Sequence, residues 1–342
     1  MSILRFKYRP INEEGRETGL FASTGELTQS ELILGKEHIP LASIYQMLRQ
    51  HDRLAIGYGC GEELAGQAIA VYGGAAAILK KEVDRLCSNR WEQARRAELA
   101  RDGKEKYFRT AKCSGCGASV DLTGFDETPQ YYCPFCEYLN DAQPTECERK
   151  VDYSVCEECR YFSRPRRFTS FYFFFPCVFF YVYWRTRNCC GACLRKRVWK
   201  MFFMNLPFLV GVPNAVAALI RAYGARSIDP DYPELDSANS AAQSGDVVRA
   251  EKMYHAMLER RPVAAGIRYN LAHAYAQTGQ WQECMDAAHE SLADCSNYQP
   301  AADLIRLVLT DLGQSEDAEA FQRDWGRIPN GLEGTREADN IG

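Results

Sequence analysis

Apolar runs alternate with short turn signals over the first 60 of the 342 residues. The turns contain glycine, asparagine and threonine-glycine pairs, which separate strands in β-rich domains. This pattern predicts a small β module over residues 1–60. Its expected strands are Ile3–Tyr8, Gly19–Ala22, Glu31–Leu34 and Arg53–Tyr58.

Two stretches of this module, ELILGKEHIPLASI and DRLAIGY, carry a family resemblance. They resemble the opening half of a pleckstrin-homology-like (PH-like) or GRAM-like module. The resemblance implies a compact β fold, and a plain β-sheet with no ligand is the alternative.

The pattern changes to that of a helix after residue 60. An alanine-rich stretch over residues 64–79 precedes a densely charged stretch over residues 81–106. The charged stretch carries only a thin apolar stripe, which is typical of a coiled coil or of a helix that separates domains. We therefore predict a helical strut over residues 61–112.

An internal repeat lies near the carboxyl end, over residues 234–327. Gly245, Gly279 and Gly313 follow one another at intervals of 34 residues, each between two helix-like segments. This period resembles that of the tetratricopeptide repeat (TPR). The resemblance implies an α-solenoid of about three helix pairs that recruits a peptide or protein, followed by a flexible tail over residues 328–342.

Three polar or aromatic residues are candidates for binding that client. Tyr269, His273 and Gln277 are spaced by four residues on the expected first helix of the central repeat. This spacing places them on one face of the helix. An ordinary solvated face explains the same residues equally well.

Cysteine pairs give the strongest chemical signal among the 15 cysteines. Two C-x2-C pairs lie 16 residues apart and form the predicted first site. Its ligands are Cys113, Cys116, Cys133 and Cys136. Four thiolates can surround one tetrahedral Zn²⁺, and residues 113–148 resemble a zinc ribbon. The alternatives are a rubredoxin-like iron site and a thiol oxidoreductase that acts through Cys133 and Cys136.

A second pair of C-x2-C motifs predicts another structural zinc site, within a module over residues 149–226. Its ligands are Cys156, Cys159, Cys190 and Cys193, with Cys189 competing for the position of Cys190. A closed four-cysteine site leaves no coordination position for a substrate. We therefore expect two structural Zn²⁺ ions and identify no catalytic residue.

The charge distribution points to an anionic partner. Residues 160–226 contain 12 Lys and Arg and no Asp or Glu, although the whole chain has a net charge of -4. The flanking residues 113–159 and 227–342 are both acidic. An acid-free block between acidic neighbours is typical of a surface that meets an anionic partner.

Two apolar runs lie inside this basic block. Residues 168–184 favour an aromatic β-hairpin that turns near Pro176, since Phe, Tyr, Val and Thr favour strands. If the four cysteines around it share one metal, the hairpin cannot cross a membrane. Residues 201–220 are long enough to span, but Pro207, Gly211 and Pro213 interrupt them. A shallow helical hairpin, which dips rather than spans, is the preferred interpretation.

These features together predict a membrane-docking module. The candidate docking residues are Phe173, Phe174, Phe175, Phe179, Phe180, Trp184, Arg185, Arg187, Trp199, Phe202 and Phe203. The layout of the module resembles that of uncharacterised bacterial membrane-associated zinc proteins. The alternative is that both apolar runs are buried core.

The expected fold class is a multidomain α+β chain, and the mean hydropathy of -0.37 excludes a polytopic membrane protein. No apolar signal segment is seen at Met1–Pro10, so we expect a cytoplasmic start. The function expected is a non-enzymatic scaffold, peripheral or monotopic on the inner face of a membrane. Its partners would be anionic lipid or an integral membrane protein, and a client of the repeats. A zinc-ribbon protein that binds nucleic acid, with the repeats as its assembly domain, is the alternative.

Overall fold

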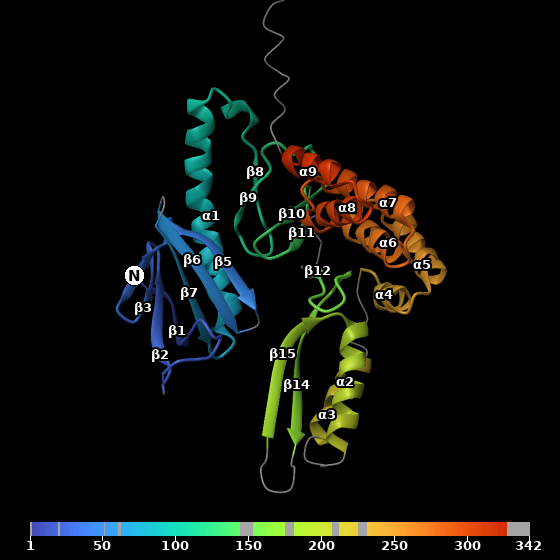
Figure 1. Ribbon diagram of the computed structural model, residues 1–342, viewed down its shortest axis with the longest axis horizontal. Coiled ribbons are helices and arrows are strands. Elements are labelled where there is room, and N and C mark those ends of the chain that lie inside the picture. The colour runs from blue at the N-terminus through green and yellow to red at the C-terminus, as the bar shows by residue number, and fades with distance from the viewer. Residues whose placement is uncertain are drawn as a thin grey trace, which may run out of the picture. The chain divides into compact units, whose positions relative to one another are not determined.

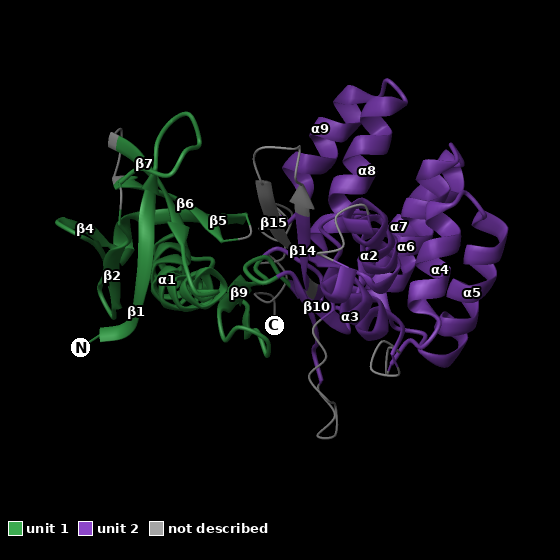
Figure 2. Cartoon of the chain, turned by 90° about the horizontal axis from the view of Figure 1, so that it is seen from below, with its two compact units in different colours: residues 1–123, 133–136 green, residues 124–132, 137–342 purple. Residues whose placement is uncertain are grey.

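The computed structural model confirms a mixed α+β chain (Figure 1). The residues it describes are 2–19, 21–50, 52–60, 63–143, 153–174, 181–206, 212–224 and 231–326. The chain forms two compact units (Figure 2). Unit 1 comprises residues 1–123 and 133–136, and unit 2 comprises residues 124–132 and 137–342.

Unit 1 is built on a seven-stranded sheet in the order β4-β3-β2-β1-β7-β6-β5, in which all neighbouring strands are antiparallel. Its strands are β1 (Ser2–Ile11), β2 (Ser23–Thr28), β3 (Glu31–Leu34), β4 (Glu37–Pro40), β5 (Ile44–Gln50), β6 (Arg53–Cys60) and β7 (Glu63–Val71). A 3-10 turn, η1 (Leu41–Ser43), joins β4 to β5. Three of the four predicted strands are confirmed.

Helix α1 (Ala75–Arg101) contributes to the core of this sheet. Ala76, Leu79 and Val83 are buried with strand residues such as Ile69. The core forms because one face of α1 is apolar while its other face is charged. The N-terminal module therefore extends beyond the predicted residue 60 and includes α1.

Two of the predicted boundaries are wrong. The predicted strand Gly19–Ala22 is not a strand, and β2 begins at Ser23 instead. The predicted helix over residues 61–112 begins only at Ala75, because Glu63–Val71 forms β7. Ile69, Ala70 and Val71 are all buried, and the strand pairs with β1 and β6 on its two sides. The alanines of this segment led us to predict a helix, but packing within the sheet determines its conformation.

Short strands follow α1 along the chain. They are β8 (Thr110–Lys112), β9 (Ser119–Asp121), β10 (Gln130–Cys133), β11 (Tyr138–Asp141), β12 (Ser154–Val155) and β13 (Phe162–Ser163), with a 3-10 turn η2 (Glu105–Tyr107) before β8. They form three two-stranded ladders, β8-β9, β10-β11 and β12-β13. Each ladder adjoins a C-x2-C turn.

The basic block of unit 2 contains two hairpins. Strands β14 (Arg166–Phe174) and β15 (Tyr181–Cys189) pair antiparallel, which confirms the predicted aromatic hairpin. Helices α2 (Gly191–Asn205) and α3 (Val212–Tyr223) follow. The predicted turn at Pro176 and the interruption at residues 207–211 lie outside the described residues. Among the helices that the structure describes, none combines the length and apolar content needed to cross a bilayer.

The C-terminal part of unit 2 consists of three helix pairs. The helices are α4 (Leu235–Gln243), α5 (Val247–Arg260), α6 (Ala265–Gln277), α7 (Trp281–Asp294), α8 (Gln299–Asp311) and α9 (Ser315–Asp324). Gly245, Gly279 and Gly313 lie between the members of a pair, with φ of 83°, 73° and 77°. Glycine adopts this left-handed conformation without steric cost. The predicted 34-residue repeat is therefore a repeat of helix pairs, and the predicted tail over residues 328–342 lies outside the described residues.

Candidate metal centres and the repeat face

The first predicted cysteine set forms a cluster within unit 1. The four sulfur atoms all lie within 4.8 Å of one another, and they belong to Cys113, Cys116, Cys133 and Cys136. Cys113 Sγ is 3.5 Å from Cys136 Sγ, and Cys116 Sγ is 3.6 Å from Cys133 Sγ. A hydrogen bond from the Cys116 thiol lowers the pKa of Cys113, whereas hydrogen bonding to Cys113 raises the pKa of Cys133 and of Cys136. The four pKa shifts therefore differ in sign, and metal binding requires all four cysteines to become thiolates.

The second predicted set forms an equivalent cluster within unit 2. Cys156, Cys159, Cys190 and Cys193 meet the same 4.8 Å limit, and Cys159 Sγ is 3.7 Å from Cys190 Sγ. Cys189 is buried beside this cluster, where desolvation raises its pKa to about 12. Of the two neighbours, Cys190 is thus the residue that the fold directs to the cluster.

Both clusters fit a tetrahedral metal ion. Metal–sulfur bonds of about 2.3 Å place neighbouring sulfurs of a tetrahedron about 3.8 Å apart. The three sulfur–sulfur distances, 3.5, 3.6 and 3.7 Å, are close to this value. A dithiol redox pair needs two sulfurs, whereas each cluster gathers four. The geometry therefore favours metal binding over the oxidoreductase alternative.

The same backbone turn recurs at three of the four C-x2-C pairs. The residue after the second cysteine is left-handed at Gly117 (φ 75°), Glu137 (φ 62°) and Arg160 (φ 63°). At two of these turns its amide donates to the carbonyl of the first cysteine, over 2.8 Å from Gly117 to Cys113 and 3.0 Å from Arg160 to Cys156. This turn brings both sulfurs of a pair to one side. A non-glycine residue in this conformation costs about 1–2 kcal/mol, so the surrounding fold stabilises the two non-glycine turns.

The fourth pair lies at a helix N-terminus. Cys190 is the N-cap of α2, and its sulfur accepts a hydrogen bond from the Cys193 amide over 3.4 Å. The Cys190 amide in turn donates to Cys156 Sγ over 3.3 Å. Two backbone amides thus point at cluster sulfurs, which stabilises the thiolate form. The helix dipole acts in the same direction.

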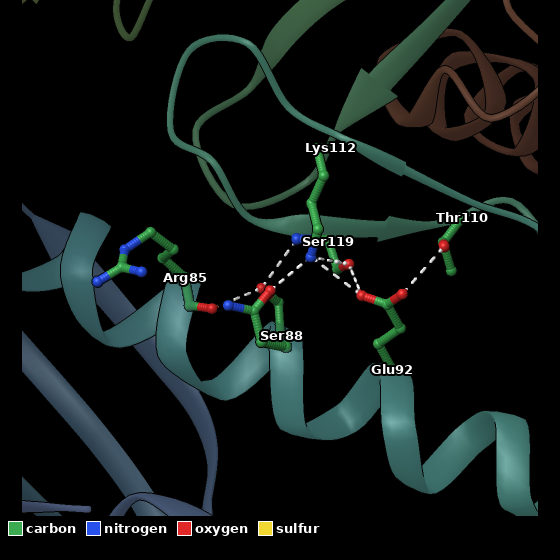
Figure 3. Close-up of polar contacts among 7 residues, drawn as sticks. Arg85, Ser88, Glu92, Thr110, Lys112 and Ser119 are labelled. Carbon is green, nitrogen blue, oxygen red and sulfur yellow. Dashed lines mark hydrogen bonds and ion pairs between the residues drawn. The ribbon is translucent and has the colours of Figure 1, made fainter. Parts of the chain in front are cut away.

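Helix α1 positions the first cluster through polar contacts with β8 and β9 (Figure 3). The Ser119 amide donates to Ser88 Oγ over 2.9 Å, and Lys112 Nζ donates to Glu92 over 3.0 Å. Ser119 Oγ also donates to Glu92, and these bonds lower the pKa of that carboxyl. Lys80 Nζ donates to the Phe135 carbonyl over 2.8 Å, inside the second C-x2-C turn. The helix therefore holds both turns of the cluster.

The second cluster is held by the first helices of the repeats. Asn270 of α6 bonds both backbone groups of Phe162: its Oδ1 accepts from the amide over 2.6 Å, and its Nδ2 donates to the carbonyl over 2.8 Å. Asn239 of α4 donates to the same carbonyl over 3.0 Å. The Phe162 ring packs against Gly266, where any β-carbon would overlap it. The repeats thus hold β13, three residues after the second knuckle cysteine.

A second extended segment is held in the same way. Asn297, next to the start of α8, accepts from the Tyr132 amide and donates to the Tyr132 carbonyl, both over 2.8 Å. Gln130 Oε1 accepts from the Ala265 amide over 3.0 Å. We call Asn239, Asn270 and Asn297 the asparagine clamp. These residues were not predicted from the sequence, because an isolated asparagine in a helical repeat has no distinctive spacing.

The three predicted client-binding residues contact the chain itself. Tyr269 Oη donates to the Arg160 carbonyl over 3.0 Å, and Gln277 Oε1 accepts from Tyr161 Oη over 3.0 Å. The His273 ring lies 4.7 Å from that of Tyr161, and burial lowers the pKa of His273. In this structure the face that we expected to recruit a client is therefore covered by residues 160–163.

The predicted membrane-docking residues lie on the two hairpins. Trp199 and Phe203 of α2 are 42% and 61% exposed, and Phe202 is half-buried. The backbones of Phe173, Phe174, Trp184, Arg185 and Arg187 lie in β14 and β15. Phe175, Phe179 and Phe180 lie outside the described residues. The structure places the described candidates within one module.

The fold and the clusters define a chain of helix-pair repeats that carries two four-cysteine centres. No protein-family model and no curated protein matches the chain. Among solved structures it is similar to a crystal structure of MamA, at 14% identity over 38% of this chain and 75% of that chain, with a TM-score of 0.25. Structures of MamA AMB-1 and MamA MSR-1 have identities of 17% and 19% and TM-scores of 0.27 and 0.25. They cover 40% of this chain and 94% and 91% of theirs.

Proposed function

We propose that the protein is a scaffold that docks on an anionic membrane surface. In this proposal two structural Zn²⁺ ions hold the docking module rigid, and the TPR-like repeats join it to protein partners. The observation that carries the proposal is the segregation of charge along the two hairpins of unit 2. We call their ends near the cysteines the base, and the ends near residues 175–180 and 207–211 the tip.

Cations concentrate at the base, and apolar residues at the tip. Strand β14 begins at Arg166 and ends at Phe174, and its register pairs these residues with Cys189 and Tyr181. Helix α2 has its last cation at Lys200 and continues with five uncharged residues to Asn205. Helix α3 runs back from the tip and reaches its first cation only at Arg221. The two hairpins lie side by side (Figure 1), so both have their cations at the base and their apolar residues at the tip.

The dimensions of the apolar tip match one leaflet. Four consecutive cross-strand pairs, from Phe171 with Trp184 to Phe174 with Tyr181, are uncharged. At about 3.3 Å per residue they extend about 13 Å. The apolar part of α3, Val212–Ile220, extends about 13 Å at about 1.5 Å per residue. One leaflet contributes about 15 Å of the hydrocarbon core, so the tip dips into a leaflet without crossing the bilayer.

The boundary between base and tip has the composition of a membrane interface. Trp199 Nε1 donates to Tyr223 Oη over 3.0 Å, and both side chains are exposed. Lys200 and Arg221 lie beside them in the sequence and are exposed as well. Trp and Tyr favour the headgroup level, and cations there attract anionic lipid.

Zinc is the metal that best suits the two centres. Four sulfur ligands in a tetrahedral arrangement select Zn²⁺ or iron. A closed Zn²⁺ site stabilises a small module through its folding free energy. At the second site the ligands join β12-β13 to the start of α2, so the ion would fix the base of both hairpins.

The repeats have two roles in this proposal. Their asparagine clamp holds the segments that carry the cysteine turns, which couples the docking module to the repeats. A protein partner then binds either another surface of the repeats or the same face after residues 160–163 have left it. The N-terminal module, which we propose to be PH-like, completes the scaffold.

Vesicle flotation tests the docking proposal. The full chain is mixed with vesicles of phosphatidylcholine alone or with phosphatidylglycerol added. At about 1 kcal/mol per cation near the surface, the two exposed cations Lys200 and Arg221 predict binding about 30-fold tighter to the anionic vesicles. Phe203→Glu should lower that binding at least about tenfold, since burial of a Phe side chain contributes about 1.5–3 kcal/mol.

The matched control for this variant is Val248→Glu. Val248 lies on α5 of the repeats and is 80% exposed, so this variant places the same new charge away from the tip. It should float like the wild type. Equal loss in both variants, or equal binding to both kinds of vesicle, would contradict the proposal.

A further inference from the structure

A cavity lies between the two hairpins of the docking module. It has a volume of about 590 Å³, within the range of ligand pockets, and its wall comes from β14, α2 and α3. Three buried side chains form its apolar part, Phe168, Leu194 and Ala222. Arg166 and Arg221 also line it, and Arg221 is exposed.

The two arginines lie at the base of the module, and the apolar wall continues toward the tip. Arg166 is the first residue of β14, and Arg221 lies in the last turn of α3. Phe171 and Ala218 line the cavity farther along the same two elements. The cavity therefore has a cationic end at the base and a mainly apolar end toward the tip, with Thr169 and Asn214 as its uncharged polar lining residues. An anionic amphiphile likewise joins a charged group to an apolar part.

We propose that this cavity binds one anionic phospholipid, with its phosphate at Arg166 and Arg221 and an acyl chain along Phe168, Leu194 and Ala218. The charge of the wall supports this choice, since the residues that line the cavity include no carboxylate side chain that would repel the phosphate. Guanidinium groups bind phosphate with charge-assisted hydrogen bonds. The orientation rests on the proposed docking: a tip that dips into a leaflet puts the apolar end toward the hydrocarbon and the arginines at headgroup level.

The site can be tested with a lipid that stays in solution. Dihexanoyl phosphatidylglycerol, below its micelle-forming concentration, is titrated into the full chain by calorimetry. We expect saturable binding of one molecule per chain. Dihexanoyl phosphatidylcholine and inorganic phosphate should each bind at least about tenfold more weakly, because the first has no net negative charge and the second has no acyl chain.

Two matched pairs of variants locate the site. Arg221→Gln should weaken binding about tenfold, as expected for loss of a charge-assisted hydrogen bond. Lys196→Gln removes one charge from an exposed position of the same module outside the cavity wall and should leave binding unchanged. Ala218→Leu narrows the cavity and should abolish binding. Ala217→Leu makes the same change one residue earlier, outside the cavity wall, and serves as its control.

Vesicle flotation of the same variants separates this proposal from membrane docking. Ala218→Leu should still float with anionic vesicles, because its apolar tip and its cations are intact. If the chain floats but Ala218→Leu and Ala217→Leu bind the short-chain lipid alike, the cavity is not the lipid site and docking stands. If the short-chain lipid binds and the chain fails to float, docking is wrong and the site stands. If inorganic phosphate binds as tightly as dihexanoyl phosphatidylglycerol, the cavity recognises only an anion, and the proposal is wrong.

Discussion

Gly266→Ala provides a sharp test of how the repeats hold the second cysteine turn. An alanine inside a helix is normally more favourable than glycine by about 1 kcal/mol. Here a β-carbon at position 266 would lie 2.5 Å from Cδ1 and Cδ2 of Phe162. The ring cannot move away freely, since the clamp fixes both backbone groups of Phe162. The substitution should therefore destabilise the protein.

The magnitude follows from overpacking. Forcing an extra methyl group into a filled core costs about 1–3 kcal/mol, which exceeds the helical gain of about 1 kcal/mol. In a Phe162→Ala background the clash is absent, and the same Gly266→Ala step should then stabilise by about 1 kcal/mol. The helical gain cancels between the two backgrounds, so the double-mutant cycle should give a coupling free energy of about 1–3 kcal/mol between the two positions.

Urea unfolding of the four proteins, followed by helical circular dichroism, measures this cycle. Hydrogen exchange at the Phe162 amide reports the same contact locally, and Gly266→Ala should accelerate it. If Gly266→Ala stabilises the protein in both backgrounds, the ring does not pack on α6, and the account of the repeat face is refuted.

Two further predictions concern the metal centres and a buried carboxyl group. Cys133→Ser and Cys190→Ser should each lower the zinc content from two ions per chain to one, whereas Cys189→Ser should retain two. Elemental analysis of the purified variants measures this content. Loss of an ion in Cys189→Ser, with none lost in Cys190→Ser, would reverse our ligand assignment. Burial raises the pKa of Asp84 to about 6, against the opposing charge of Lys80. The folded state then keeps a proton that the unfolded state loses near pH 4, so the free energy of unfolding falls by about 3 kcal/mol between about pH 4 and pH 6. Asp84→Asn should remove this part of the pH dependence in urea titrations, and an unchanged profile would refute the assignment.

Spacing alone was enough to predict both cysteine clusters and the repeats. Paired C-x2-C motifs place four sulfurs where one ion can bind them, and the two clusters in the structure contain the predicted residues. The 34-residue spacing of Gly245, Gly279 and Gly313 likewise corresponds to turns between paired helices. In both cases one residue type is required at a fixed spacing: cysteine as a metal ligand in the clusters, and glycine in a left-handed turn in the repeats.

Features set by tertiary packing could not be predicted in this way. Strand β7 is rich in alanine, and its place between β1 and β6 determines its conformation. The asparagine clamp depends on segments more than 100 residues apart in the sequence, as with Phe162 and Asn270. The left-handed conformations of Glu137 and Arg160 were also missed, because the sequence has glycine at only one of the three equivalent turns.

The helix face that was predicted to bind a client shows most clearly what residue spacing cannot predict. Periodicity placed Tyr269, His273 and Gln277 on one helical face, and all three do contact residues 160–161. Periodicity shows which residues share a face, whereas the identity of the segment that covers it depends on the whole fold. Here the covering segment belongs to the same chain.

Membrane fractionation of cells that express the full chain tests the central claim most directly. The membrane pellet is washed with high salt and then with alkaline carbonate, and the chain is followed in each fraction. Docking through the apolar tip predicts that the protein stays with the membranes through both washes. Recovery of the full chain in the soluble fraction at low salt would contradict this account, and would indicate that the apolar hairpins are core.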